Sequence, residues 1–345
     1  MTKDSVASTT GVSIEHDSLR LGPVRVYFQR TLRIPEKGLH YLPPGMGRFP
    51  LRRVDDYPDT VPADWRARGG VMLPIYQREA MWLAFSTREP AAALQVGIGE
   101  VCAVSGEQWS PELVREPQNY LALPEQLWLD GINSGEGQIR QFVAVPLGLG
   151  ATVEAQVTGV EVHGGIQLRA VGLTDAGLAA ARREEAARAE AEREMVYALE
   201  ASGAPLMDSP WPSPMPPPTG APMGLGAGGS MRQEIYEDPR PVTDYDPERS
   251  WEVVVHLCSA DQWTAITGEK APSTPVDRDA YVERGFPWFD YYDADNKDLD
   301  APEVFDGVES VGKVLGEKAP PFEPVDPKTV ITIKGKTADE VGKPA

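Results

Sequence analysis

Cysteine, histidine and long apolar runs are scarce in this sequence of 345 residues. Its two cysteines, Cys102 and Cys258, lie far apart, which argues against a disulfide framework and favours a reducing compartment. The four histidines do not have the spacing of metal ligands, so we expect no zinc. The longest uncharged apolar stretch, residues 142–151, is about half as long as a membrane-spanning helix. We therefore predict a cytoplasmic protein that does not enter a membrane and holds no cofactor.

Positive charge is scarce as well. The formal net charge is −19, and no run of lysine and arginine is longer than a pair such as Arg52–Arg53. Phosphate backbones repel an acidic chain unless a local basic patch overcomes the repulsion. The sequence therefore predicts no nucleic-acid partner.

Residues 21–173 are dominated by patterns typical of strands. Around Ala155, for example, apolar residues alternate with Glu154 and Gln156, which is the period of a strand with one wet face. Strands are predicted at 24–34, 80–86, 92–99, 100–106, 138–146, 151–159 and 164–172. Their number and spacing predict a mainly β N-terminal domain, a sandwich or a barrel, after a flexible N-terminus at residues 1–20.

The remainder is predicted to contain a helix, a linker and a small second domain. Thr174 is a suitable helix N-cap, and the charged, alanine-rich residues 174–201 indicate a mostly solvated helix. Residues 202–248 are rich in Pro, Gly and Met and predict a disordered linker. Residues 249–336 predict a small α+β C-terminal domain, in which Ser259 and Gly268 bound a short helix, before a flexible tail at 337–345.

An aromatic and acidic stretch at residues 285–303 raises the question of a calcium site. The spacing of an EF-hand loop fails here, because Lys297 would stand at a ligand position. A looser calcium site formed by Asp293, Asp295 and Asp298 is the alternative to a solvated acidic turn anchored by its aromatic residues. We favour the solvated turn.

The turn at residues 127–142 has the most site-like composition of the N-terminal domain. Trp128, Asp130, Asn133 and Arg140 surround a Gly-rich turn and could together hold a sugar or the end of a peptide. A tight turn with an Asp-Gly corner explains the same residues without a ligand, and we favour that interpretation.

Two further patterns come close to known chemistry without completing it. Residues 307–314 nearly match a phosphate-binding P-loop, but Val314 replaces the required hydroxyl and Glu309 would face the phosphate. His256 and Cys258 project from the same face of a predicted strand, where neighbours are usually too far apart for a catalytic dyad. We predict no catalytic residue at either place.

Several phrases of the sequence resemble a bacterial and fungal family of hypothetical proteins. They are LPPGMGRFPL, YQREAMWLAF, WLDGIN, IRQFVAVPLG and GFPWFDYYD. The resemblance implies no activity, no cofactor and no site residue.

The function favoured by the sequence is that of a non-enzymatic, cytoplasmic interaction or structural protein with a protein partner, and a homo-oligomer is compatible with this role. The hypothesis rests on the charged helix and the Pro-rich segment, which are typical partner surfaces. The alternative is a glycan- or peptide-binding protein, or an enzyme, that uses the turn at residues 127–142.

Overall fold

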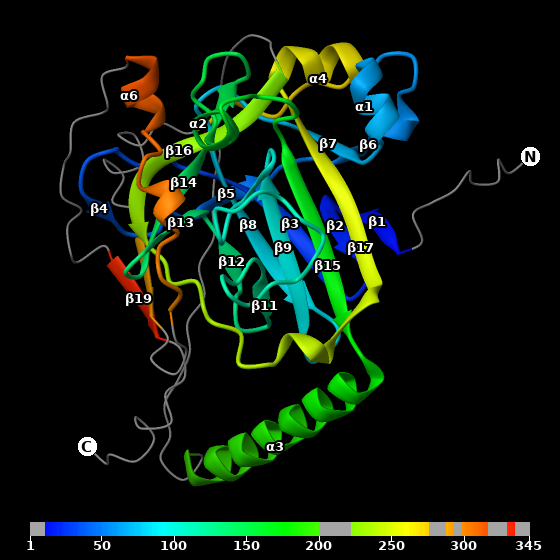
Figure 1. The fold of residues 1–345 in the computed structure, drawn as a ribbon, viewed down its shortest axis with the longest axis vertical. Coiled ribbons are helices and arrows are strands. Elements are labelled where there is room, and N and C mark those ends of the chain that lie inside the picture. Colours follow the sequence, from blue (N-terminus) through cyan, green and yellow to red (C-terminus); the bar gives the residue numbers. More distant parts are fainter. Residues whose placement is uncertain (1–10, 200–221, 276–287, 293–297, 317–329, 335–345) are drawn as a thin grey trace, which may run out of the picture.

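The computed structural model describes residues 11–199, 222–275, 288–292, 298–316 and 330–334. The fold is mainly β, with one large sheet and few helices (Figure 1). The strands are β1 (Val12–Glu15), β2 (Ser18–Leu21), β3 (Val24–Thr31), β4 (Leu39–His40), β5 (Gly45–Arg48), β6 (Arg52–Arg53), β7 (Val71–Pro74), β8 (Ala80–Thr87), β9 (Ala92–Ile98), β10 (Val101–Cys102), β11 (Leu121–Leu123), β12 (Trp128–Leu129), β13 (Gly131–Gly135), β14 (Gln138–Pro146), β15 (Ile166–Leu173), β16 (Pro222–Arg232), β17 (Tyr245–Cys258), β18 (Trp288–Tyr292) and β19 (Val330–Lys334). The helices are η1 (Val54–Asp56), α1 (Ala63–Arg68), α2 (Val153–Thr158), α3 (Asp175–Leu199), η2 (Val242–Asp244), α4 (Ala260–Thr267), η3 (Glu303–Phe305) and α6 (Val311–Leu315).

Two groups of neighbouring strands enclose the main core. The first contains β3, β8, β14 and β16, and the second contains β9, β15, β17 and β7. The pairing of Pro222 and Met223 with the end of β17 joins the two groups. Alternate residues from both groups, such as Leu83 and Leu94, are fully buried in one common cluster. The two groups therefore share one apolar interior.

Three smaller apolar clusters cover the outer face of the sheet. The end of β17 is covered by α1 and α4, with Trp65 and Trp263 packed around Cys258. The start of α3 covers β9 and β15 through Leu178 and Ala181. The short helix α6 covers β8 and β14 through Val311.

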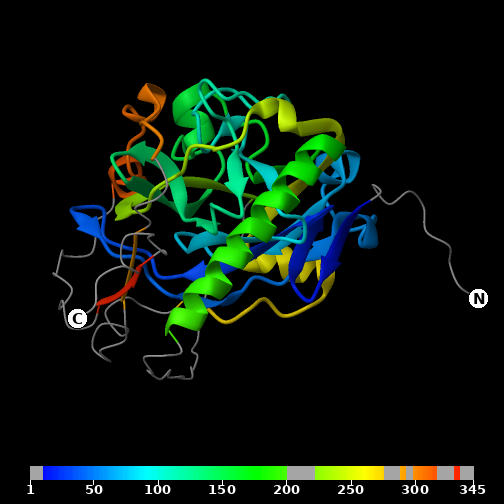
Figure 2. The ribbon, with the colours of Figure 1, turned by 90° about the horizontal axis from the view of Figure 1, so that it is seen from below.

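Helix α3 projects from this body (Figures 1 and 2). Its 25 residues correspond to a length of about 37 Å. Thr174 caps it, because its hydroxyl accepts the backbone N–H of Gly177 at 3.0 Å. The prediction of a long, capped helix after Thr174 is confirmed. None of the helices in the described residues has the length and apolarity to span a membrane.

The predicted domain boundaries differ from the observed sheet. Strand β1 and most of β2 lie within residues 1–20, which the sequence predicts to be flexible; of these, only residues 11–20 are described. Strand β16 lies within the predicted linker 202–248 and pairs with β14 along most of its length. Strand β17, assigned to a second domain, pairs with β15 and completes the main core.

Close packing explains why the Gly-rich segment forms a strand. A Cβ atom at Gly229 would lie 2.0 Å from the carbonyl oxygen of Pro35, and one at Gly226 would lie 2.6 Å from that of Ala151. Only glycine lets the chain run this close to its neighbours. The composition that predicts a linker is therefore a packing requirement of β16.

The predicted strand at residues 151–159 is wrong, because residues 153–158 form α2. The hydroxyl of Thr152 accepts the N–H of Ala155 at 3.0 Å, and Gly159 ends the helix with φ of 81°. The alternating pattern is misleading because Glu154 is buried, and its carboxylate accepts the N–H groups of Val162 and Gly164. In contrast, the caps predicted for α4 are confirmed: Ser259 accepts the N–H of Gln262, and Gly268 is left-handed.

Candidate functional site

The turn at residues 127–142 contributes its polar side chains to internal contacts. Asp130 is buried and faces Gln233: the Gln233 amide donates to Asp130 Oδ2 at 2.8 Å, and its oxygen accepts the Asp130 N–H at 2.9 Å. Burial raises the pKa of Asp130 to about 7. Trp128 is half-buried against the main core. These contacts hold β12 against the chain that follows β16.

Asn133 and Arg140 fasten the segment from Asp298 to Val308 onto the sheet. The Asn133 amide donates to the carbonyl of Asp300 at 3.0 Å, and its oxygen accepts the N–H of Gly135 at 2.9 Å. The Arg140 guanidinium donates to the carbonyl of Val308, and burial lowers the pKa of Arg140. Asp130, Asn133 and Arg140 therefore contact three different partners and do not converge on one site. Of the four residues predicted to bind a ligand, Asn133 lines a cleft next to residues 299–304.

Asp298 is the described member of the predicted calcium site. Its two carboxylate oxygens accept the backbone N–H groups of Gly137 at 2.7 Å and Ile235 at 2.9 Å. Asp293 and Asp295 lie outside the described residues, so the calcium site stays a prediction. Within the described ranges, no three His, Cys, Asp or Glu side chains are grouped as metal ligands.

A carboxylate occupies the place where the near P-loop match would hold a phosphate. Helix α6 begins within residues 307–314, and the Glu36 carboxylate accepts the N–H of Gly312 and the hydroxyl of Ser310, both at 2.6 Å. Exposed amides at a helix start favour a negative partner, and Glu36 supplies it from within the chain. Gly312 of this motif therefore serves the packing of α6 on Glu36, which follows β3.

His256 and Cys258 each contact a backbone carbonyl. The ring of His256 stacks on Trp65 at 4.5 Å, and its Nε2 lies 2.9 Å from the Gly69 oxygen. Burial lowers the pKa of His256 to about 4, so the imidazole is neutral near pH 7. The Cys258 thiol donates to the Leu73 oxygen at 3.1 Å, and burial raises its pKa. A buried, protonated thiol is unreactive.

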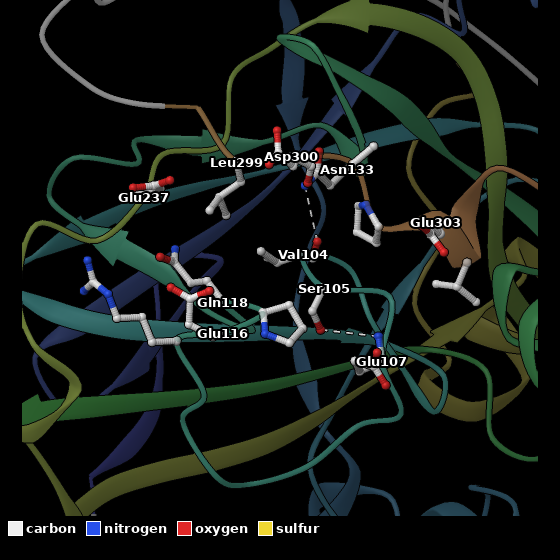
Figure 3. A pocket seen from close by; sticks show the side chains of 15 residues that line it. Val104, Ser105, Glu107, Glu116, Gln118, Asn133, Glu237, Leu299, Asp300 and Glu303 are labelled. Atoms are coloured by element: carbon white, nitrogen blue, oxygen red, sulfur yellow. Dashed lines mark hydrogen bonds between the residues drawn. The ribbon is translucent and has the colours of Figure 1, made fainter.

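A cleft of about 550 Å³ opens between the loops after β10 and the segment before η3 (Figure 3). We call it the acidic cleft, because five carboxylates and one guanidinium lie along its walls. Its charged residues are Glu107, Glu116, Glu237, Asp300, Glu303 and Arg115. The Arg115 guanidinium donates to the carbonyl of Arg240, so this single cation is bound to the wall. The cleft is therefore strongly negative and suits a cationic ligand.

A sequence pattern marks one wall of this cleft, whereas the other wall carries no recognisable pattern. Asp300 and Glu303 belong to the stretch 285–303, which is recognisable in the sequence by its high density of acidic residues. Glu107 and Glu116 lie more than 180 positions earlier, in loops with no motif. Their proximity depends on how β10, β11 and β13 are arranged in the sheet, which no local pattern encodes.

Comparison with known proteins gives no family. The chain matches no protein-family model, and no curated protein sequence or solved structure shows significant similarity to it.

Proposed function

We propose that the protein is a non-enzymatic interaction protein and that its acidic cleft binds a basic segment of a partner protein. The observation that carries this proposal is the gathering of five carboxylates from three separate segments around one cleft of about 550 Å³. The net charge of −19 adds long-range attraction for a cationic partner. Both cysteines are free and buried, which supports a cytoplasmic location as part of the same proposal.

The cleft is open enough to take side chains of lysine or arginine. Glu107 and Glu303 belong to two different walls of the cleft, one in the loop after β10 and the other at the start of η3 (Figure 3). A basic side chain between them would be attracted by both walls. Each exposed ion pair of this kind contributes about 0.5 kcal/mol. Binding would therefore depend on several carboxylates together and would weaken with salt.

The test measures binding of a fluorescent Lys-Ala repeat peptide to the full chain, with a Glu-Ala repeat peptide as the negative probe. Three neutral, equally sized substitutions, Glu107→Gln, Glu116→Gln and Glu303→Gln, are combined in one variant. We expect its Kd for the basic peptide to rise about tenfold, because three weak ion pairs are lost together.

A matched control separates the cleft from the overall charge. Glu185, Glu190 and Glu248 are exposed and lie outside the cleft, and changing all three to glutamine removes the same number of charges. This control variant should bind the basic peptide as well as the unmodified protein does. Equal weakening in both variants, or no binding of the basic peptide at all, would overturn the proposal.

A further inference from the structure

A second cleft, of about 390 Å³, lies on the outer face of the β9–β15–β17 layer. We call it the Gln167 cleft. It is bounded by β15 and β17, by the chain around η1, and by the end of α1 at Arg68. Its size is within the roughly 300–1,000 Å³ typical of small-molecule sites. None of its residues belongs to the acidic cleft.

The amide of Gln167 is the unusual feature of this cleft. The residue is only 6% exposed, and neither its nitrogen nor its oxygen has a hydrogen-bond partner in the described part of the chain. Its neighbour along β15, Arg169, is paired, with Nε 2.8 Å from Glu252 and Nη1 donating to Gln95 at 3.3 Å. A buried amide without partners is costly, so the position calls for a donor and an acceptor from outside the chain.

An aromatic ring lies next to this amide. Gly97 of β9 is directly opposite Gln167 in the strand register. A Cβ atom at Gly97 would lie 2.6 Å from the Trp109 indole and 3.1 Å from the Gln167 oxygen. Glycine therefore leaves room for the Trp109 indole on the sheet, and both the indole and the Gln167 amide lie beside Gly97. Trp109 and Gln167 both line the cleft.

The rim of the cleft carries one guanidinium that is unpaired among the described residues. Asp55 is paired with Arg53 at 3.1 Å, Glu252 with Arg169, and Glu100 lies 3.4 Å from His163. The Arg68 side chain forms no ion pair and no hydrogen bond with any other described residue, although its charge helps to lower the pKa of His256. A guanidinium in this position suits a phosphate group.

We propose that the Gln167 cleft binds a nucleoside monophosphate. A nucleobase presents a donor and an acceptor side by side on its edge, which is the pattern that a glutamine amide pairs with. Its flat face suits stacking on Trp109, and its phosphate suits Arg68. The terminal torsion of a glutamine side chain is soft, so the amide can turn toward a base in the cleft without a backbone change.

The test uses the full chain and eight probes: adenosine, guanosine, cytidine, uridine and their monophosphates. Binding is measured by isothermal titration and by the rise in melting temperature with probe concentration. We expect one base to bind, its monophosphate to bind more tightly than its nucleoside, and Gln167→Leu to weaken binding by about tenfold or more. Arg68→Gln should remove only the advantage of the monophosphate.

Two controls keep the result interpretable. Gln167→Leu removes an unpaired buried amide, so the variant should fold at least as well as the unmodified protein, and loss of binding cannot be ascribed to unfolding. Gln262→Leu, on α4 and outside the cleft, should bind the probe normally. The proposal is overturned if no probe binds at millimolar concentration, or if a folded Gln167→Leu variant keeps full affinity.

Discussion

Two glutamines, Gln233 and Gln167, are 5% and 6% exposed, yet the regions around them differ in kind. Around Gln233 the amide is satisfied, because both its atoms exchange hydrogen bonds with Asp130. Around Gln167 the amide has no partner among the described residues. The first region has the composition of a binding site, but its polar groups contact each other. The second region carries no sequence motif, and it has an unsatisfied polar group with which a ligand could form hydrogen bonds.

Five residues after Gln233, Asp238 is the centre of a second hydrogen-bond network. One carboxylate oxygen of Asp238 accepts the hydroxyls of Tyr120 at 2.9 Å and Tyr245 at 2.8 Å, and the other accepts the N–H of Arg240 at 2.8 Å. Burial, with the carboxylate nearby, raises the pKa of both tyrosines. The tyrosines therefore stay protonated and bind the chain after β16 to the sheet.

The largest effect on stability is expected when the hydrogen-bond network around Asp238 loses this carboxylate. Asp238→Ala leaves three buried donors unpaired and should lower the free energy of unfolding by about 4 kcal/mol. Urea unfolding measures the loss. Tyr245→Phe removes a single hydrogen bond and should cost about 1 kcal/mol. A loss in Asp238→Ala no larger than that in Tyr245→Phe would contradict the network.

A second effect is a pH dependence of stability that originates at Asp130. Its pKa is about 7 in the folded protein, whereas an unfolded aspartate titrates near about 3.9. The folded state therefore binds a proton more tightly, and the contribution of Asp130 to stability falls as the pH rises from about 4 to about 7. The slope should approach about 1.4 kcal/mol per pH unit.

The measurement for Asp130 is urea unfolding at several pH values in this window. In Asp130→Asn this component of the slope should vanish, because the amide does not titrate. The attribution fails if the unmodified protein and the variant show the same slope between pH 4 and 7.

A smaller effect is expected at the floor of the Gln167 cleft. Gly97→Ala places a methyl group 2.6 Å from the Trp109 ring and should lower the free energy of unfolding by about 2 kcal/mol. In a Trp109→Ala background the same Gly97→Ala change should cost much less. Gly307→Ala is the control, since nothing lies within 4 Å of a Cβ atom there. Equal effects at Gly97 and Gly307 would show that the indole does not lie on the strand.

Local signals in the sequence account for the elements that were predicted correctly. Thr174, Ser259 and Gly268 bound α3 and α4 through contacts within a few residues, so their roles are visible in the sequence. The mainly β character follows from alternation such as that along β3. The predicted separation into two domains failed at β16, because the sequence does not show how closely Pro35 approaches Gly229.

The two clefts could be predicted only in part. The alternation in β15 places Gln167 and Arg169 on one face, opposite to Leu168, and so marks them as the polar side of a strand. Whether each finds a partner depends on Gln95 and Glu252, which belong to different strands. Trp109 and Gly97 carry no motif; the register of β9 and β15 brings Gly97 to Gln167, and the loop after β10 brings Trp109 there.

The comparison of the two glutamines is tested most directly by making the same substitution at both positions. Gln233→Leu leaves the Asp130 N–H and carboxylate without the amide, so the free energy of unfolding should fall by about 2 kcal/mol. Gln167→Leu removes an unpaired amide and should leave the ligand-free protein unchanged or more stable by about 1 kcal/mol. Urea unfolding of both variants without added ligand measures the difference. A loss in Gln167→Leu as large as that in Gln233→Leu would contradict the account.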